Sequence, residues 1–261
     1  MNAVIHVDDH LVVVNKPSGL LSVPGRGPEK QDCVWHRVQA QFSDALVVHR
    51  LDQATSGLLV LARGIEAQRR LSRAFAHRLV NKRYLAWVMG HPKAQSVTLP
   101  VHPGNRNSGT PPSMDTAPAS AGTPPQADRT GSPEPGWHSI DLPIIADWPN
   151  RPLQIISAQG RTCLTYWRPL EQREAPDLTL LELQPHTGRS HQLRVHLQAI
   201  GHPILGDDLY GSPEAPASPA LQLHAWRLTL PHPFEDRTLA LEAPLPGHWG
   251  QIAVQPPGSP G

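Results

Sequence analysis

The chain has 261 residues, of which 39% are hydrophobic, 5% are aromatic and 30 are prolines. This length suits one large domain or two small ones, but the proline content indicates a folded core smaller than the length suggests. A net charge of +1, from 23 basic and 22 acidic residues, excludes a protein that holds nucleic acid by bulk electrostatics, so any basic surface must be local.

The cysteine content predicts a reducing compartment. Cys33 and Cys163 are too few for a disulfide framework and lack the spacing of a metal site. The N-terminal apolar run from Leu11 to Val14 is too short for a signal sequence, and no later stretch approaches the length of a membrane span. We therefore expect a soluble, cytoplasmic protein without membrane contact.

The N-terminal segment is predicted to form two short strands over 4–7 and 11–14, followed by a loop over 15–27. The loop sequence, NKPSGLLSVPGRG, lacks the Gly-Lys-Ser/Thr ending of a phosphate-binding loop. Residues 28–42 then have apolar side chains at helical spacing and a proline in the first turn. This pattern predicts a helix that faces the core.

Asp52 lies in a turn between two apolar runs, 46–48 and 57–61, which both predict buried strands. The residues from Gln53 to Ser56 are small or polar and suit a turn. An aspartate in such a turn most often hydrogen-bonds its own backbone. A carboxylate at the end of a buried strand is also well placed for chemistry, and on these residues alone both interpretations stay open.

A basic segment follows the second of these strands. Residues 65–80 predict a helix with Leu71, Phe75 and Leu79 on its core face, and residues 80–90 predict a strand. The basic residues can lie along an RNA backbone, although an arginine-rich helix face is usually only solvated. They are Arg63, Arg69, Arg70, Arg73, Arg78, Lys82 and Arg83.

Residues 102–136 differ in composition from the rest of the chain. Of these 35 residues, 21 are Pro, Gly, Ser or Thr, and the only strongly apolar one is Met114. Such a segment cannot bury enough apolar surface to offset the entropy of ordering it, so we predict a disordered surface insertion. Without it, the chain ending at Pro100 joins IDLPIIADWPNRPLQ at 140–154 as one continuous segment.

The C-terminal part is predicted to contain strands over 162–170, 178–183 and 221–230, and a frayed tail after Val254. A helix lies between the second and third of these strands. Its apolar positions share one side, and the helix ends at a glycine cap before a proline. These helix positions are Leu193, Leu197, Ile200, Gly201 and Pro203.

Three histidines in this region, His186, His191 and His196, suggest a metal site at first. They are five residues apart, whereas a zinc pair on one helix face requires a spacing of four. We therefore predict no metal site.

Several stretches of the sequence resemble the motifs of the RluA-type pseudouridine synthases. The resemblance implies an α+β fold of the pseudouridine synthase type, with a mixed, mostly antiparallel central sheet, flanking helices and an RNA-binding cleft. It also implies that residues 1–261 form a single catalytic domain, interrupted by the insertion at 102–136, without a separate N-terminal RNA-binding domain. The stretches are NKPSGLLSVPGRG at 15–27, HRLDQATSGLLVLAR at 49–63, KRYLA at 82–86 and HTGRSHQLRVHLQAIGHPILGDDLYG at 186–211.

The resemblance also implies roles for single side chains. It makes Asp52 the catalytic nucleophile, Tyr84 the residue that stacks on the target uracil, and Arg189 the cation that pairs with Asp52 and holds it ionised. By the same resemblance, Arg50 fills the space that the flipped-out nucleotide leaves. The residues expected to contact RNA are Arg50, Arg69, Arg70, Arg73, Lys82 and Arg83.

The implied reaction isomerises uridine to pseudouridine: the bond from N1 to the ribose breaks, the uracil rotates, and it rejoins through C5. A carboxylate is a competent nucleophile for this step, so we expect neither cofactor nor metal. The stretch IDLPIIADWPNRP resembles one in dual-specificity members of the family, which implies a uridine in a 23S rRNA hairpin, in the tRNA anticodon loop, or in both. We expect a monomer that acts on RNA stem-loops.

Two functions from other classes remain as alternatives. A non-catalytic RNA-binding module would tolerate the loss of Asp52 or Tyr84, but both are present. A glycosidase or nucleosidase on small substrates needs a second carboxylate, and the strong motifs offer only Asp207 and Asp208, in a turn after the helix. Release of tritium from uracil-5-tritiated RNA separates the three functions, since only the isomerase exchanges that hydrogen.

Overall fold

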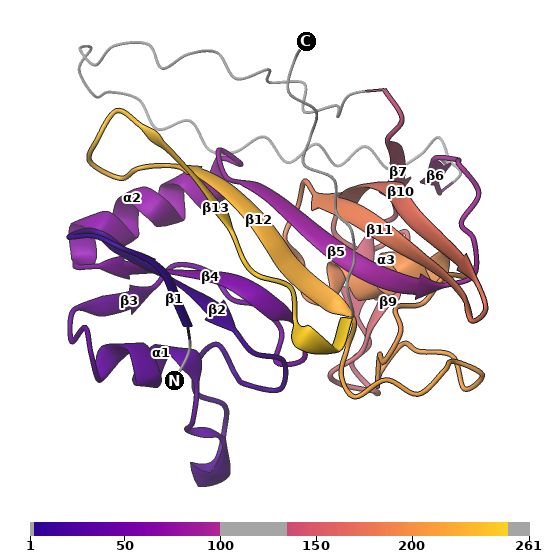
Figure 1. Ribbon diagram of the computed structural model, residues 1–261, viewed down its shortest axis with the longest axis horizontal. Coiled ribbons are helices and arrows are strands. Elements are labelled where there is room, and N and C mark those ends of the chain that lie inside the picture. The colour runs from indigo at the N-terminus through magenta and orange to yellow at the C-terminus, as the bar shows by residue number, and fades with distance from the viewer. Residues whose placement is uncertain (1–2, 100–134, 250–261) are drawn as a thin grey trace.

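The computed structural model describes residues 3–99 and 135–249, and a long mixed sheet forms its centre (Figure 1). Only β4 with β12 and β6 with β7 pair in parallel among the described strands of this sheet. The fold is thus α+β with a mostly antiparallel sheet, as predicted. The order across the sheet is β1 (Ala3–Val7), β2 (Leu11–Lys16), β4 (Ser56–Arg63), β12 (Leu223–Pro231), β5 (Asn81–Met89), β11 (Asp177–Pro185), β10 (Leu164–Glu174), β7 (His138–Asp141) and β6 (Val97–Thr98).

Shorter elements complete the fold. Strand β3 (Ala45–Val47) pairs with β4, β13 (Thr238–Glu242) pairs with β12, and β8 (Ile144–Ala146) forms a separate hairpin with β9 (Gln154–Ile156). The α-helices are α1 (Val34–Gln39), α2 (Ile65–Ala76) and α3 (Gln192–Ala199), and the 3-10 helices are η1 (Pro28–Lys30) and η2 (Gly247–Trp249). Helices α1 and α2 lie in one half of the molecule with β1 to β4, and α3 lies in the other (Figure 1).

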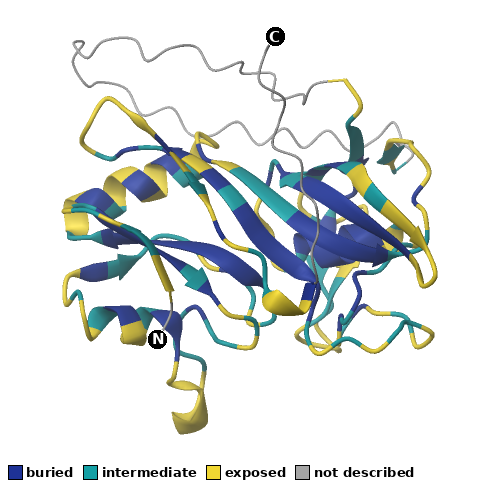
Figure 2. Cartoon of the chain, viewed as in Figure 1, coloured by how far each residue is buried: buried dark blue, intermediate teal, exposed yellow. Residues whose placement is uncertain are grey.

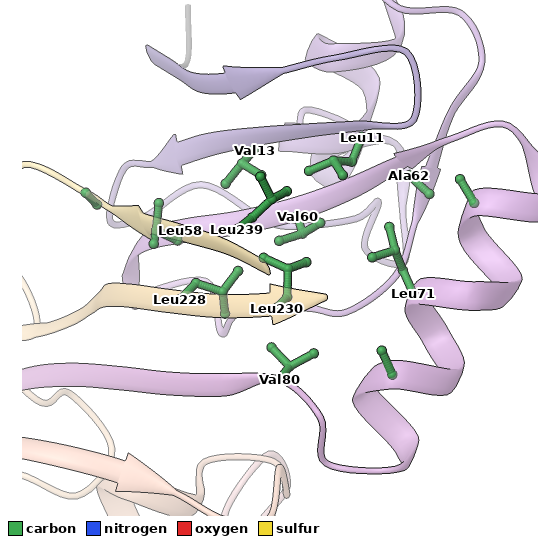
Figure 3. Packing of buried hydrophobic residues seen from close by; sticks show 13 residues of the cluster. Leu11, Val13, Leu58, Val60, Ala62, Leu71, Val80, Leu228, Leu230 and Leu239 are labelled. Carbon is green, nitrogen blue, oxygen red and sulfur yellow. The ribbon is translucent and has the colours of Figure 1, made fainter. Parts of the chain in front are cut away.

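Strand β4 is buried on both faces, which explains its nearly continuous aliphatic sequence. Leu58 and Val60 belong to one hydrophobic cluster with Leu71 of α2, and Val60 lies between Leu58 and Leu71 (Figure 3). The alternate residues Leu59 and Leu61 pack with the buried side chains of α1 on the opposite face. Figure 2 shows this burial along the middle of the sheet. Because β4 is packed on both faces, the loop that carries Asp52 ends at a fixed position, the start of β4.

The helix predicted over 28–42 is interrupted. Cys33 has an extended backbone, with φ −154° and ψ 164°, and separates η1 from α1. Its sulfur accepts a hydrogen bond from the backbone N–H of His36 and so caps α1. The apolar spacing could not reveal this break, because it depends on the bridge between Cys33 and Leu21, in the preceding loop.

Helix α2 also ends earlier than predicted. Its last helical residue is Ala76, and Arg78 follows with a left-handed backbone, φ +59°. Leu79, predicted on the core face, is 60% exposed as a result. The buried face of the helix consists of Ala67, Leu71 and Ala74 instead.

The other predicted strands and the helix with its glycine cap are present, with Gly201 at φ +84° after α3. Strands β6, β7, β8, β9 and β13 were not predicted. The insertion predicted over 102–136 lies outside the described residues, apart from its last two, and so does the tail after Val254. Its flanks meet in the sheet, where Val97 of β6 lies opposite Ile140 of β7. In the described parts of the chain, no helix has the length and apolar character needed to cross a membrane.

Candidate active site

A pocket of about 750 Å³ brings together stretches that lie far apart in the sequence. Its walls come from residues 21–23, 49–55, 75–84 and 185–194, together with Leu223. Of the residues predicted to form the site, Arg50, Asp52, Lys82, Tyr84 and Arg189 all line it. Asp52 supplies the only carboxylate among the described lining residues.

The loop that carries Asp52 is held by the stretch 16–22. The Lys16 ammonium donates to the carbonyl oxygens of Gln53 at 2.8 Å and Leu20 at 2.6 Å. Ser22 Oγ donates to the Leu51 carbonyl at 2.7 Å and accepts from the Leu51 N–H. Burial lowers the pKa of Lys16 to about 7, while the negative charge of Asp52 opposes this shift. The backbone on both sides of Asp52 is therefore fixed by contacts with residues 29 and 37 positions earlier in the chain.

The Asp52 side chain is left available by this arrangement. Its backbone carbonyl accepts the Thr55 N–H at 3.1 Å, which closes the turn. No hydrogen bond or ion pair of the described residues engages its carboxylate. The carboxylate therefore does not hold the turn, whereas an aspartate that caps its own backbone would use its carboxylate for this purpose.

The entry into β4 requires a glycine. Gly57 has φ +109°, and a Cβ there would lie 2.3 Å from the backbone oxygen of Ala225 in β12. Only glycine allows this close approach of the parallel strands directly after the loop. The TSG part of the motif therefore has a structural explanation.

The predicted ion pair between Arg189 and Asp52 is not formed within the described structure. Arg189 is exposed on the loop before α3, where its guanidinium lies near the buried Cys163. Burial raises the pKa of the Cys163 thiol, and the charge of Arg189 opposes the shift. Arg189 thus lines the pocket, but its side chain is directed to Cys163 and not to Asp52.

Arg194, which was not predicted, is the arginine fixed close to Asp52. Its side chain is 3% exposed and binds Asp207 in a bidentate manner, at 2.8 and 2.5 Å, and Asp208 at 2.8 Å. Burial alone would lower the pKa of Arg194, but Asp207, Asp52 and Asp208 together raise it. Arg194 follows Arg189 by five residues in the same motif. The sequence therefore contained both arginines as candidates for the cation near Asp52, but no local pattern distinguished them.

Tyr84 lies on β5 beside the pocket, between two hydrophobic clusters that its ring joins. Burial, and then the charge of Asp52, raise the pKa of the Tyr84 phenol. The side chain is therefore a neutral aromatic surface near the carboxylate.

His49 supports the same wall. Its Nε2 accepts the Val60 N–H at 3.0 Å, and its ring stacks on Phe75 with 4.5 Å between centroids. Burial lowers the pKa of His49 to about 3, with a smaller contribution from Lys82. His49 is thus a neutral residue that connects the HRLD motif to β4, and not a proton carrier at neutral pH.

The residues predicted to contact RNA fall into separate groups. Arg50 and Lys82 line the pocket, whereas Arg69, Arg70 and Arg73 are exposed on α2 and are absent from its described lining. Arg70 pairs with Glu66 at 3.0 Å and lies over the Phe234 ring at 4.4 Å.

Arg83 faces away from the pocket, in contrast to its neighbours. Side chains alternate along a strand, so Lys82 and Tyr84 share one face of β5 and Arg83 takes the other. There it pairs with the buried Glu182 at 3.3 Å and lies over Trp137. Arg83 therefore lies outside the pocket wall that Lys82 and Tyr84 share, because the period of the strand separates them, and its contact with RNA stays a prediction.

The three histidines that suggested a metal site are dispersed. His196 is buried and bonded to Thr165 Oγ1 and the Leu142 carbonyl, both at 2.9 Å, and burial lowers its pKa to about 4. His191 lies 2.7 Å from the Tyr210 hydroxyl, which also accepts the Gln154 N–H. Within the described residues, no group of three or more His, Cys, Asp or Glu side chains is placed to hold a metal ion. The His191 contact instead connects the β8–β9 hairpin to the pocket wall.

Comparisons with known proteins agree with this geometry. A model of the RNA pseudouridylate synthase family matches residues 10–199. The dual-specificity RNA pseudouridine synthase RluA of Escherichia coli strain K12 is 42% identical over 243 residues, which cover 92% of each chain. The enzyme of the same name from Yersinia pestis is 44% identical, over 88% of this chain and 92% of its own.

Solved structures give the same result for the fold. Human RNA Pseudouridylate Synthase Domain Containing 4 superposes with a TM-score of 0.62 at 25% identity, covering 94% of this chain and 88% of its own. Human RNA Pseudouridylate Synthase Domain Containing 1 gives a TM-score of 0.66 at 24% identity, covering 94% of this chain and 84% of its own.

Proposed function

The chain belongs to the RNA pseudouridylate synthase family, and we propose that it isomerises a flipped-out uridine in structured RNA with Asp52 as the nucleophile. The observation that carries the assignment of Asp52 is its position in the pocket. It is the only carboxylate among the described lining residues, and its oxygens are free of the hydrogen bonds that hold its own loop.

Asp52 can begin the reaction by adding to the nucleotide at ribose C1′ or at uracil C6. Either route breaks the bond from C1′ to N1 and forms one from C1′ to C5; the hydrogen on C5 leaves as a proton, and N1 acquires one. The carboxylate is regenerated at the end. These steps need no redox partner, and all of the atoms retained in the product come from the substrate or from solvent.

Two cations interact with the charge of Asp52. They are the buried guanidinium of Arg194 and the ammonium of Lys16, and neither makes a direct ion pair that would block the carboxylate within the described structure. The carboxylate therefore stays accessible for attack on the nucleotide.

Tyr84 and Arg50 complete the site. The neutral ring of Tyr84 beside Asp52 offers a face on which a displaced uracil can stack. Arg50 is exposed at the pocket, where its planar cation can enter the space left in the RNA stack. A base in a hairpin loop is the least costly to flip, so a stem-loop is the natural substrate.

For the substrate we propose a uridine in a 23S rRNA hairpin, in the tRNA anticodon loop, or in both, modified in the cytoplasm by a monomer. Relatives named dual-specificity enzymes support this proposal. So does the stretch IDLPIIADWPNRP, which contains β8 and the turn that leads to β9. At the hairpin tip Trp148 is 66% exposed, with Arg151 lying over its ring at 3.5 Å, next to the connection that Tyr210 makes to the pocket wall.

Among the described residues that line the pocket, a glycosidase mechanism has no second carboxylate available. Asp207 is buried in the ion pair with Arg194 and also accepts the N–H groups of Leu209 and Tyr210. Its role is therefore structural.

Tritium release tests the proposed function. The full-length protein is incubated with uracil-5-tritiated transcripts of a tRNA anticodon stem-loop and of 23S rRNA hairpins, and tritium in the solvent is counted against time. We expect release from at least one RNA, accompanied by pseudouridine in nuclease digests of it. Binding of these RNAs without release would contradict the proposed reaction, and release from one class only would restrict the substrate.

A further inference from the structure

One wall of the pocket carries positive charge that the proposed chemistry does not use. Arg78 enters it from the turn between α2 and β5, Lys82 from β5, and His186 from the loop after β11. Arg78 Nη1 lies 2.8 Å from His186 Nε2. A guanidinium can only donate, so His186 accepts through Nε2 and is neutral in this contact. Its imidazole holds the guanidinium of Arg78 against the wall.

Arg78 follows the C-cap of α2, where its N–H donates to the Phe75 carbonyl at 3.2 Å and the Leu79 N–H donates to the Ala74 carbonyl at 2.9 Å, the usual end of a helix. The φ of Arg78, +59°, lies in the left-handed region, which a side chain other than glycine rarely adopts. The left-handed turn that ends α2 sets the Arg78 side chain in the pocket lining, where His186 meets its guanidinium.

Lys82 has no counter-charge. No described carboxylate lies within 4.0 Å of its Nζ, which stands against the loop at Gly188, 3.8 Å from the point where a Cβ would be. Burial, and to a smaller extent the charge of Arg78, lower the pKa of Lys82 to about 8. By contrast, Arg70 and Arg194 each have a carboxylate partner.

The charge balance of the pocket is therefore incomplete without a ligand. Arg50, Arg78, Lys82 and Arg189 line it and have no carboxylate partner among the described residues, and Asp52 is the one acid. Like charges gathered around one pocket repel each other, and an anion that binds between them removes this repulsion. The chemical class that fits is a tetrahedral oxyanion, which accepts hydrogen bonds from a guanidinium and an ammonium together.

We propose that Arg78 and Lys82, with His186 as the residue that positions Arg78, bind the phosphodiester next to the target uridine. This inference rests on the proposed function, because it places a nucleotide beside Asp52 and Tyr84. The phosphate contact would fix the register of the RNA strand, so that the flipped uracil arrives at the carboxylate. Arg69, Arg70 and Arg73 on α2 cannot do this, since they lie outside the described lining of the pocket.

The decisive experiment changes the RNA and the protein together. A stem-loop substrate is synthesised with a single methylphosphonate, which removes one negative charge, at each linkage around the target uridine in turn. Binding to the full-length protein is measured by fluorescence anisotropy, and pseudouridine formation is measured at saturating protein. For the wild type, we expect one flanking linkage at which the methylphosphonate weakens binding by about tenfold.

Arg78→Gln and Lys82→Gln should each weaken binding of the unmodified RNA by a similar factor. With the methylphosphonate at that same linkage, they should cause little further loss. They should also lower the slope of log affinity against log salt concentration by about 0.7 for each phosphate contact that is lost. The matched control is Arg173→Gln, because Arg173 pairs with Glu171 and lies over Trp87, a residue of the opposite face of β5. It should leave both the affinity and the salt slope unchanged.

Two results would overturn the proposal. One is a wild-type protein whose RNA affinity does not change with a methylphosphonate at either flanking linkage. The other is that the loss of affinity caused by a variant and the loss caused by the methylphosphonate multiply when the two changes are combined. The first arm needs no variant, so a variant that fails to fold leaves the test intact. Failure of the proposed function is separate, since it appears as unmodified RNA that binds but yields no pseudouridine.

Discussion

The guanidinium of Arg194 binds the carboxylate of Asp207 in a fully buried pair, with Nε 2.8 Å from Oδ2. Asp207 also accepts two backbone N–H groups, so the pair fixes the turn after α3 as well as the arginine. The cation that acts on Asp52 from this side is therefore held in place by a residue that does not line the pocket. This arrangement replaces the expected Arg189–Asp52 pair and leads to the first two predictions.

Asp207→Asn should destabilise the protein by about 3 kcal/mol or more, because it leaves the buried charge of Arg194 without its main partner. Urea denaturation followed by tryptophan fluorescence measures the change. Asp208→Asn is the matched control: its side chain is 75% exposed, so the loss should stay at or below about 1 kcal/mol. Equal effects of the two substitutions would contradict the structural role of Asp207.

Arg194→Lys should lower the single-turnover rate by at least about tenfold, because lysine retains the charge but not the planar, bidentate contact that fixes it. Arg189→Lys should change the rate far less, since its guanidinium is directed to Cys163. Both rates are measured at saturating protein, with RNA affinity measured in parallel. A larger loss for Arg189→Lys would restore the pairing that the sequence motif suggested.

Asp52→Asn should abolish pseudouridine formation while RNA affinity stays nearly unchanged. The substitution preserves the shape of the side chain but removes the nucleophile. The loop itself should persist, because it is held through the backbone by Lys16 and Ser22. Product is measured in nuclease digests after prolonged incubation. A residual rate close to that of the wild type would remove Asp52 from the mechanism.

RNA affinity should fall as pH rises above about 8. The pKa of Lys82 is lowered from 10.5 to about 8, so above pH 8 the free protein loses the charge and must regain a proton to bind phosphate. The total loss should level off at about tenfold, the factor expected for Lys82→Gln, because the neutral form still binds through its other contacts. Arg78 keeps its charge and His186 is already neutral in its contact with Arg78, so neither produces this fall.

Lys82→Arg should flatten this pH profile, because arginine stays protonated throughout the range. Lys16, which also has a lowered pKa, is unchanged in this variant. The difference between the two profiles therefore belongs to Lys82. Profiles that fall in parallel would show that another group controls the affinity.

Replacing residues 102–134 by a short Gly-Ser linker should leave folding and turnover nearly intact. A linker is needed because β6 and β7 run parallel, so the chain must cross from the end of β6 back to the start of β7. Loop-closure entropy varies only logarithmically with length, so the free energy of unfolding should change by no more than about 2 kcal/mol. Thermal melting and tritium release measure the two effects, and loss of cooperative melting would show that the segment belongs to the fold.

The sequence alone determined the features of this protein that depend on local periodicity and on motifs. The aliphatic run at 57–61 predicted a strand covered on both faces, and its alternating neighbours in the structure confirm this. The turn before it predicted a loop with Asp52, and Gly201 predicted the end of α3. Even the position of Arg83 was contained in the alternation of β5, since Lys82 and Tyr84 bracket it. The faces of strands and helices follow from side chains that recur every two or 3.6 residues, and the turn and the helix end follow from neighbouring residues, so none of these features needs a distant partner.

Only the tertiary structure decided which side chains meet. Arg189 and Arg194 stand in one motif, and the choice between them depends on Asp207, in the turn after α3, and on Cys163, in a strand-flanking segment earlier in the chain. The wall formed by Arg78, Lys82 and His186 depends on a left-handed residue at the end of α2 and on a contact between positions 108 residues apart. Such contacts arise from the packing of the whole sheet, whose free energy is shared among many residues, so no local pattern of the sequence encodes them.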